Sequence, residues 1–175
     1  LVGSEMCIRD RYLSTYPESL SAGYFTGGLS AVGRSADDIY AACYEQLRAK
    51  SLEYYKRFPG DRVRFAELAA LAKKGEIATP SGDVVCPSRL RSLGHLLGAS
   101  GGAEKLHYLL EYPHTSRAFR HDLAELLPYG GRNPLYAVIH ESSYADGVVT
   151  DWSAARMLPD DFREDPTLLT GEHIM

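Results

Sequence analysis

The feature that most constrains this chain is a nearly continuous series of helical patterns over residues 35–165, with little strand outside it. Residues 23–28 (GYFTGG) read as a buried strand, because aromatic and β-branched residues precede two glycines. Residues 168–175 (LLTGEHIM) are a second possible strand. A lone strand leaves its backbone groups without partners, so compact domains seldom contain one. We therefore expect a mostly α chain whose helices form a lid, inserted into an α/β sheet that lies largely outside this sequence.

The composition restricts the possible partners. The chain has 175 residues, 45% of them hydrophobic, which is enough for one domain with a sizeable core. Its 19 basic and 23 acidic residues are interspersed and give a net charge of −4. This balance argues against nucleic acid, because phosphates require a basic patch. No apolar run approaches the roughly 18 residues that span a membrane. We expect neither a nucleic-acid nor a membrane partner.

The cysteines and histidines do not suggest a metal site. Cys7, Cys43 and Cys86 are odd in number and far apart, unlike a disulfide framework or a zinc ligand set. The six histidines include no pair at metal-ligand spacing beside carboxylates, so we expect no metal and no cofactor. So few cysteines favour a reducing compartment, and we expect a cytoplasmic location.

Residues 1–11 (LVGSEMCIRDR) are set apart from the fold. Charged residues interrupt any apolar centre, so the segment is unlike a signal peptide. It resembles the translated adapter sequence found at the ends of environmental gene fragments, and we expect it to be non-native. On this interpretation the chain is a fragment and Cys7 has no role.

The first long helix is expected to begin after Ser35. Ser35 followed by Asp38 has the form of an N-terminal cap with an acidic first turn, which suits the helix dipole. Pro59-Gly60 is expected to end this helix. Its apolar stripe is predicted to comprise Ile39, Cys43, Leu47, Tyr54 and Phe58.

Turn and capping signals predict the remaining elements. A second helix is expected from about Asp61 to Lys74, and TPSGD within residues 75–87 indicates an extended loop or a small hairpin. Most of the 12 tyrosines are expected to pack between helices with their hydroxyls reaching water. Further helices are predicted over residues 88–97, 101–111, 116–127, 134–145 and 152–157, followed by a link over residues 159–166.

The helix predicted over residues 134–145 carries the most informative acidic residue. At about 100° per residue, apolar side chains gather on one face, which we expect to be the core side. Glu141 lies at the border of that face, where a buried carboxylate is costly without a partner. It is either a boundary residue bonded to an arginine or a backbone cap, or an acidic anchor for a positively charged substrate group. The expected core face comprises Leu135, Val138, Ile139 and Ser142.

No complete catalytic motif is present. The sequence lacks the G-x-S-x-G nucleophile elbow, the P-loop and H-E-x-x-H. His107, within LHYLLE, is interpreted as a packed or surface residue rather than a base. Glu172 is a lone acid after a Thr-Gly turn, and its residue type alone favours a structural role.

Several segments match one known enzyme family in order. They are YLSTYPESL and YFTGGL, then GRSADDIYAACYEQL, TPSGDVV and LGHLLGASGGAEKLHYLLE, and finally NPLYAVIHESSY and TGEHIM. The first two resemble the segment after the nucleophile helix of the proline iminopeptidases, the prolyl aminopeptidases of the α/β-hydrolase fold. The next three are similar to the helical cap of the actinobacterial-type members. The resemblance covers nearly all of residues 12–175.

The resemblance implies a serine aminopeptidase that releases N-terminal proline from peptides, with a mostly helical cap over its active site. It implies that residues 12–34 are a remnant of the core, residues 35–165 the cap, and residues 166–175 the return to the sheet. In the family, the catalytic serine precedes the segment matching Tyr12, and the catalytic Asp and His follow the segment matching Met175. No triad residue is carried over, so this chain alone is expected to be inactive.

The resemblance also implies a role for acidic cap residues, because the family holds the substrate's free α-amino group with cap glutamates. Glu141, in HESSY, matches such a position, and Glu172 is a second candidate whose flanks match. We therefore expect both to bind a peptide with N-terminal proline. Two other hypotheses stay open: the cap of an α/β hydrolase of another specificity, such as an esterase or epoxide hydrolase, and a non-catalytic helical binding module.

Overall fold

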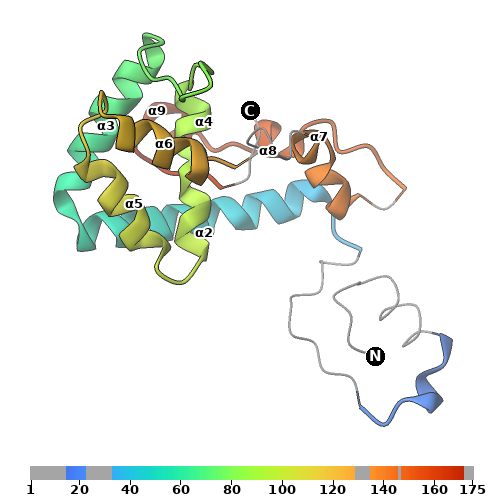
Figure 1. The fold of residues 1–175 in the computed structure, drawn as a ribbon. Coiled ribbons are helices and arrows are strands. Elements are labelled where there is room, and N and C mark those ends of the chain that lie inside the picture. Colours follow the sequence, from blue (N-terminus) through green and yellow to red (C-terminus); the bar gives the residue numbers. More distant parts are fainter. Residues whose placement is uncertain (1–14, 23–32, 129–134, 146, 172–175) are drawn as a thin grey trace. The chain divides into compact units, whose positions relative to one another are not determined.

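A computed structural model describes residues 15–22, 33–128, 135–145 and 147–171, and the chain divides into two compact units, residues 1–30 and residues 31–175. The described part of the first unit contains the short 3-10 helix η1 (Pro17–Ser19). The strand predicted over residues 23–28 lies outside the described residues. The described part of the second unit is mostly helical, as predicted (Figure 1).

The long helix α2 (Ala36–Arg57) begins where the sequence indicated. The Asp38 N–H donates a hydrogen bond to the Ser35 hydroxyl at 3.1 Å, so Ser35 caps the helix as predicted. Acidic residues occupy the first turn and Lys56 and Arg57 the last, which puts each sign of charge at the end that the helix dipole favours.

The buried side of α2 is aromatic in its first half, which differs from the prediction. Tyr40 and Tyr44 are buried, whereas the predicted stripe residues Ile39, Cys43 and Leu47 lie on the adjoining face and are only partly buried. A tyrosine can be buried where its hydroxyl finds an acceptor, and an apolar pattern does not reveal that acceptor.

Three buried tyrosines of α2 bond protein acceptors, so the expectation that their hydroxyls reach water is wrong for them. The Tyr44 hydroxyl donates to the Ala154 carbonyl in α8 (Ser153–Arg156) at 2.6 Å. The other two are Tyr54 and Tyr55, whose hydroxyls donate to the Asp61 carboxylate at 2.5 Å and the Thr167 carbonyl at 2.8 Å. Each bond joins α2 to a different part of the chain.

Helix α3 (Pro59–Lys73) starts at the proline that was expected to separate two helices. Pro59 takes the first helical position, where its missing N–H costs nothing, and Asp61, where the helix was expected to begin, lies in its first turn. The Asp61 carboxylate is buried and accepts a hydrogen bond from Arg64 at 2.9 Å as well as the bond from Tyr54. It lies 2.9 Å from His107 Nδ1 of α5 (Gly102–Glu111), so His107 is a packed residue as interpreted.

Residues 75–87 form the small hairpin that was one of the two predicted alternatives. Ala78 and Val84 make an antiparallel bridge, and the Val85 N–H donates to the Ile77 carbonyl at 2.9 Å. Gly82 turns the chain at φ 91°, a conformation that L side chains rarely adopt. The hairpin leads into α4 (Pro87–Arg91) and the 3-10 helix η2 (Ser92–Gly98).

The later helices confirm some boundaries and add one element. Helix α6 (Arg117–Leu126) is capped by Ser116, whose hydroxyl accepts from the Phe119 N–H at 3.1 Å. The predicted link over residues 159–166 instead contains α9 (Asp160–Glu164), whose first turn holds two acidic residues that suit the helix dipole. No helix among the described residues is long and apolar enough to cross a membrane.

Two buried clusters hold these helices together. The larger joins the C-terminal half of α2 to α3, α4, η2, α5 and α6, and the smaller joins its N-terminal half to α8 and α9. The fully buried side chains of the first cluster include Phe65, Phe119, Ile77, Leu90, Leu93, Leu106 and Leu123. Those of the second are Tyr44 and Phe162, whose rings meet edge to face at 5.2 Å.

A buried, non-helical segment, residues 167–170, lies against both α2 and the α4–η2 pair. No strand is assigned to it, although a strand entry was predicted from residue 168. Side chains of the surrounding helices bond its backbone at three points, and Asp165 bonds the N–H groups of residues 167 and 168. The four bonds to α2 and α4 are Tyr55 hydroxyl to Thr167 carbonyl (2.8 Å), Arg91 Nε to Leu168 carbonyl (2.8 Å), Leu169 N–H to Ser51 hydroxyl (3.1 Å) and Thr170 N–H to Arg91 carbonyl (2.9 Å).

Gly94 of η2 is where this segment comes closest to a helix. A Cβ on Gly94 would lie 2.7 Å from the Leu169 Cβ and closer still to the Thr170 carbonyl oxygen. Both atoms belong to a segment fixed by buried hydrogen bonds. The sequence therefore needs glycine here for space.

Gly94→Ala is expected to lower the free energy of unfolding by about 1–3 kcal/mol, because the added methyl group forces the buried segment away from its partners. Gly98→Ala is the matched control in the same 3-10 helix, since its Cβ would meet nothing within 4 Å. Urea unfolding followed by circular dichroism measures both. Equal stability of the two variants would contradict the close approach at Gly94.

Candidate functional site

The segment that carries Glu141 is helical but changes type within its length. Helix α7 (Tyr136–Ile139) continues into the 3-10 helix η3 (His140–Tyr144). The expected core face is wrong, because Leu135, Val138 and Ile139 are all more than half exposed while His140 and Glu141 are buried. The prediction took apolar spacing as the mark of the buried side, whereas Glu141 is buried because its carboxylate meets hydrogen-bond donors of a distant segment.

Glu141 is 4% exposed and both of its carboxylate oxygens accept backbone hydrogen bonds. The Ser153 N–H donates to Oε2 at 3.0 Å and the Ala154 N–H donates to Oε1 at 2.9 Å. These N–H groups open α8, where a helix has no internal acceptors for them. Glu141 therefore caps α8 across 12 residues of chain, which is one of the two arrangements considered for it above.

The charge state of Glu141 follows from these contacts. Burial acts to raise the pKa of the carboxyl group, but the hydrogen bonds from the Ala154 N–H, the Thr150 hydroxyl and the Ser153 N–H outweigh burial and lower the pKa. The carboxylate is therefore ionised at neutral pH. None of the ion pairs formed among the described residues includes it, and these three donors are neutral groups.

A second acid, Asp37, meets the same short helix from α2. Arg156 binds both Asp37 oxygens, at 2.7 and 3.0 Å, and the Ser153 hydroxyl donates to one of them at 2.5 Å. The hydrogen bonds from Arg156 and Ser153 lower the pKa of Asp37. Ser153 thus gives its N–H to Glu141 and its hydroxyl to Asp37, which connects η3 to the first turn of α2 through α8.

The turn before α8 is held in an uncommon conformation. Asp151 and Trp152 both have positive φ, 50° and 53°, although neither is glycine. Arg156 donates to the Asp151 carbonyl at 3.0 Å and to the Thr150 carbonyl at 2.9 Å. Arg156 therefore fixes the turn from one side while Glu141 binds the N–H groups that follow it. Such a conformation persists only where its surroundings over-determine it.

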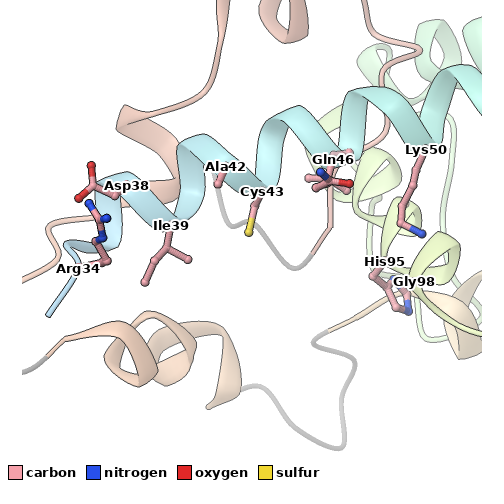
Figure 2. Close-up of a pocket in the computed structure, with 11 residues that line it drawn as sticks. Arg34, Asp38, Ile39, Ala42, Cys43, Gln46, Lys50, His95 and Gly98 are labelled. Carbon is pink, nitrogen blue, oxygen red and sulfur yellow. The ribbon is translucent and has the colours of Figure 1, made fainter. Parts of the chain in front are cut away.

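An open groove of about 690 Å³ lies beside α2 and η2. Figure 2 shows Ile39, Cys43 and Lys50 pointing to one side of α2, with His95 and Gly98 of η2 near the Lys50 end. The aliphatic stripe predicted to be core lines this groove instead. Burial raises the pKa of the Cys43 thiol, so the groove wall carries a neutral thiol rather than a thiolate.

The predicted site residues have different outcomes. Glu141 is the buried carboxylate that caps α8. Glu172 lies outside the residues that the structure describes. No group of three or more potential metal ligands occurs in the described part of the chain. The sequence interpretation missed Asp37 and Arg156, which are 119 positions apart. The only local signal was the acidic turn after Ser35, and that reads equally well as capping.

Two known proteins are similar to this chain, and no protein-family model matches it. A curated proline iminopeptidase of Aeromonas sobria is 35% identical over 150 residues, which are 83% of this chain and 35% of that protein. The proline iminopeptidase aneH of Aspergillus aculeatus is 23% identical over 149 residues, which are 82% of this chain and 33% of that protein. The chain thus spans about a third of the length of the curated relatives it matches. Over that part of their length, this chain is a homologue of the proline iminopeptidases.

Proposed function

We propose that this chain is the cap region of a serine aminopeptidase that releases N-terminal proline from peptides. The 35% identity with the Aeromonas sobria proline iminopeptidase carries the proposal. In it, residues 35–165 form the cap, residues 12–34 and 166–175 belong to an α/β-hydrolase core, and residues 1–11 are non-native. The helical character of the described residues supports the cap assignment. A cytoplasmic location is part of the proposal.

In this proposal, the catalytic groups belong to the α/β-hydrolase core and not to the cap. There a serine attacks the carbonyl carbon of the N-terminal residue, a histidine takes the serine proton, and an oxyanion hole stabilises the tetrahedral intermediate. The nucleophile and its partners are supplied by parts of the protein outside these 175 residues. The cap selects substrates by their free amino end.

Glu141 is the proposed anchor for the substrate's α-amino group, with Glu172 as a second carboxylate. A carboxylate has about four lone-pair positions, and three neutral donors bind that of Glu141. One acceptor position and the full negative charge are left for an ammonium group. Because the backbone bonds fix the carboxylate in place, the substrate would not have to order it on binding.

The 175-residue chain alone is expected to show no turnover of a proline arylamide, because the proposed nucleophile is not part of it. The full-length protein at the same molar concentration is the control and should release the arylamine. A colorimetric assay of arylamine release measures both. Turnover by the short chain would overturn the fragment interpretation.

Glu141→Gln in the full-length enzyme is expected to reduce kcat/KM for peptides with N-terminal proline by at least about thirtyfold, because the ammonium loses its charged partner. Hydrolysis of a simple ester without an amino group should change far less. Steady-state kinetics on the two substrates give the ratio. An equal loss on both would mean that Glu141 acts only by holding α8.

The structural role of Glu141 has its own pH signature. A carboxyl group whose folded-state pKa is lowered stabilises the fold above its unfolded-state pKa of 4.5, and that stability is lost as the pH falls through the folded-state value. Glu141→Gln should therefore cost about 2 kcal/mol at pH 7, with the difference from the wild type shrinking below pH 4.5. Exposed Glu67→Gln is the control. Urea unfolding of this chain between pH 3 and about 7 is the measurement; a pH-independent difference would contradict the ionised cap.

A further inference from the structure

The groove beside α2 is not accounted for by the proposal for Glu141. We propose that it binds the part of a peptide substrate that follows the released residue, in extended form, with the free carboxylate at Lys50. This inference rests on the proposed aminopeptidase function. The substrates of the aminopeptidase would then be short peptides with a free C-terminus, and not proline amides alone.

The dimensions of the groove suit a short peptide. Its wall extends along α2 from Asp38 to Lys50, as Figure 2 shows. Twelve helical positions span about 18 Å at the rise of an α-helix. An extended peptide advances about 3.3 Å per residue, so about five residues fit along this wall.

The middle of the groove has the chemistry expected of a surface that accepts side chains of many kinds. Ile39, Ala42, Cys43 and Leu47 supply apolar contacts, and none of them carries a charge. Apolar contacts are non-directional, so they bind peptides without selecting one sequence. The aliphatic stripe of α2 is thereby explained, since helical spacing put it on one face, where Ile39, Cys43 and Leu47 are only partly buried.

The charges at the two ends set the direction of the peptide. The Asp38 end adjoins Asp37, which the Ser153 hydroxyl and N–H connect to Glu141, so the amino-binding carboxylate lies toward that end. At the other end the Lys50 ammonium donates one hydrogen bond, to the Leu97 carbonyl at 2.9 Å. An ammonium has three donors, so two are left for a carboxylate. At the first end of the groove, Arg34 lies beside Asp38, so that end carries both signs of charge. The other end has the positive charge of Lys50 and no acidic side chain in its lining.

The first test fills the groove in the full-length enzyme. Ala42→Trp places a large ring in the groove, and Ala41→Trp places it on a neighbouring exposed position that does not line the groove. With a peptide of about six residues beginning with proline, of which about five would lie in the groove, Ala42→Trp should raise KM about tenfold while Ala41→Trp leaves it unchanged. Turnover of a proline arylamide, which is too short to occupy the groove, should be normal in both variants.

The second test removes the charge at the far end. Lys50→Gln should raise KM for the same peptide roughly two- to fivefold, which is the effect of one exposed ion pair. KM for the same peptide with an amidated C-terminus should not change. Lys56→Gln, an exposed lysine of the same helix outside the groove, is the matched control. This comparison stands even if Ala42→Trp fails to fold, because Lys50 is exposed.

The outcomes separate the two proposals. No turnover of proline arylamide by the wild type would overturn the aminopeptidase function and this inference with it. Normal arylamide turnover with no effect of Ala42→Trp or Lys50→Gln on the peptide would overturn the inference alone. An equal loss on peptide and arylamide in the folded Ala42→Trp variant would also overturn it, since the groove would then be covered by another part of the protein.

Discussion

The backbone of residues 167–170 is buried among helices, and a buried backbone must have hydrogen-bond partners. A sheet would supply them from neighbouring strands, but here Ser51, Tyr55 and Arg91 reach in from α2 and α4. This requirement explains three features that hydropathy alone leaves odd: a completely buried serine, a buried arginine and a glycine with no room for a methyl group. Burial lowers the pKa of Arg91, which is the electrostatic cost of using its side chain this way. These few polar bonds join residues 167–170 to α2 and α4, which belong to the apolar clusters.

The same rule operates at the other end of α2. The first N–H groups of α8 have no partners within their own short helix, and the Glu141 carboxylate binds them. Asp37 and Arg156 then connect that helix to α2 and fix the strained turn at Trp152. A buried negative charge is thus maintained by neutral donors, and the position proposed to meet a substrate is rigid because it is also structural. In the larger cluster, Asp61 joins three helices in the same manner, through Tyr54, Arg64 and His107.

Local signals predicted what local physics controls. Ser35 and Ser116 cap helices as their positions indicated, because a cap needs only a hydroxyl and an N–H three residues later. The segment that contains TPSGD forms a small hairpin, one of the two structures predicted for it. The failures share one cause. The core faces of α2 and of the α7–η3 segment were assigned from apolar spacing, but buried hydroxyls and a buried carboxylate found partners more than ten residues away. For Glu141 the sequence left a structural and a functional role open. Its bonds to the N–H groups of α8 show the structural role, and they keep the negative charge that substrate binding would require.

The sequence by itself determined the helical character, most of the helix starts, the likeness to proline iminopeptidases and the position of Glu141 as a candidate site residue. Each of these depends on neighbouring residues or on the order of motifs along the chain. The tertiary structure alone decided that tyrosines rather than aliphatic residues form the inner face at the start of α2, that Asp37 and Arg156 support α8, and that an aliphatic stripe lines an open groove. Hydrogen-bond partners 12 to 119 positions apart made these choices, and no local pattern specifies which distant partner a buried polar group will meet.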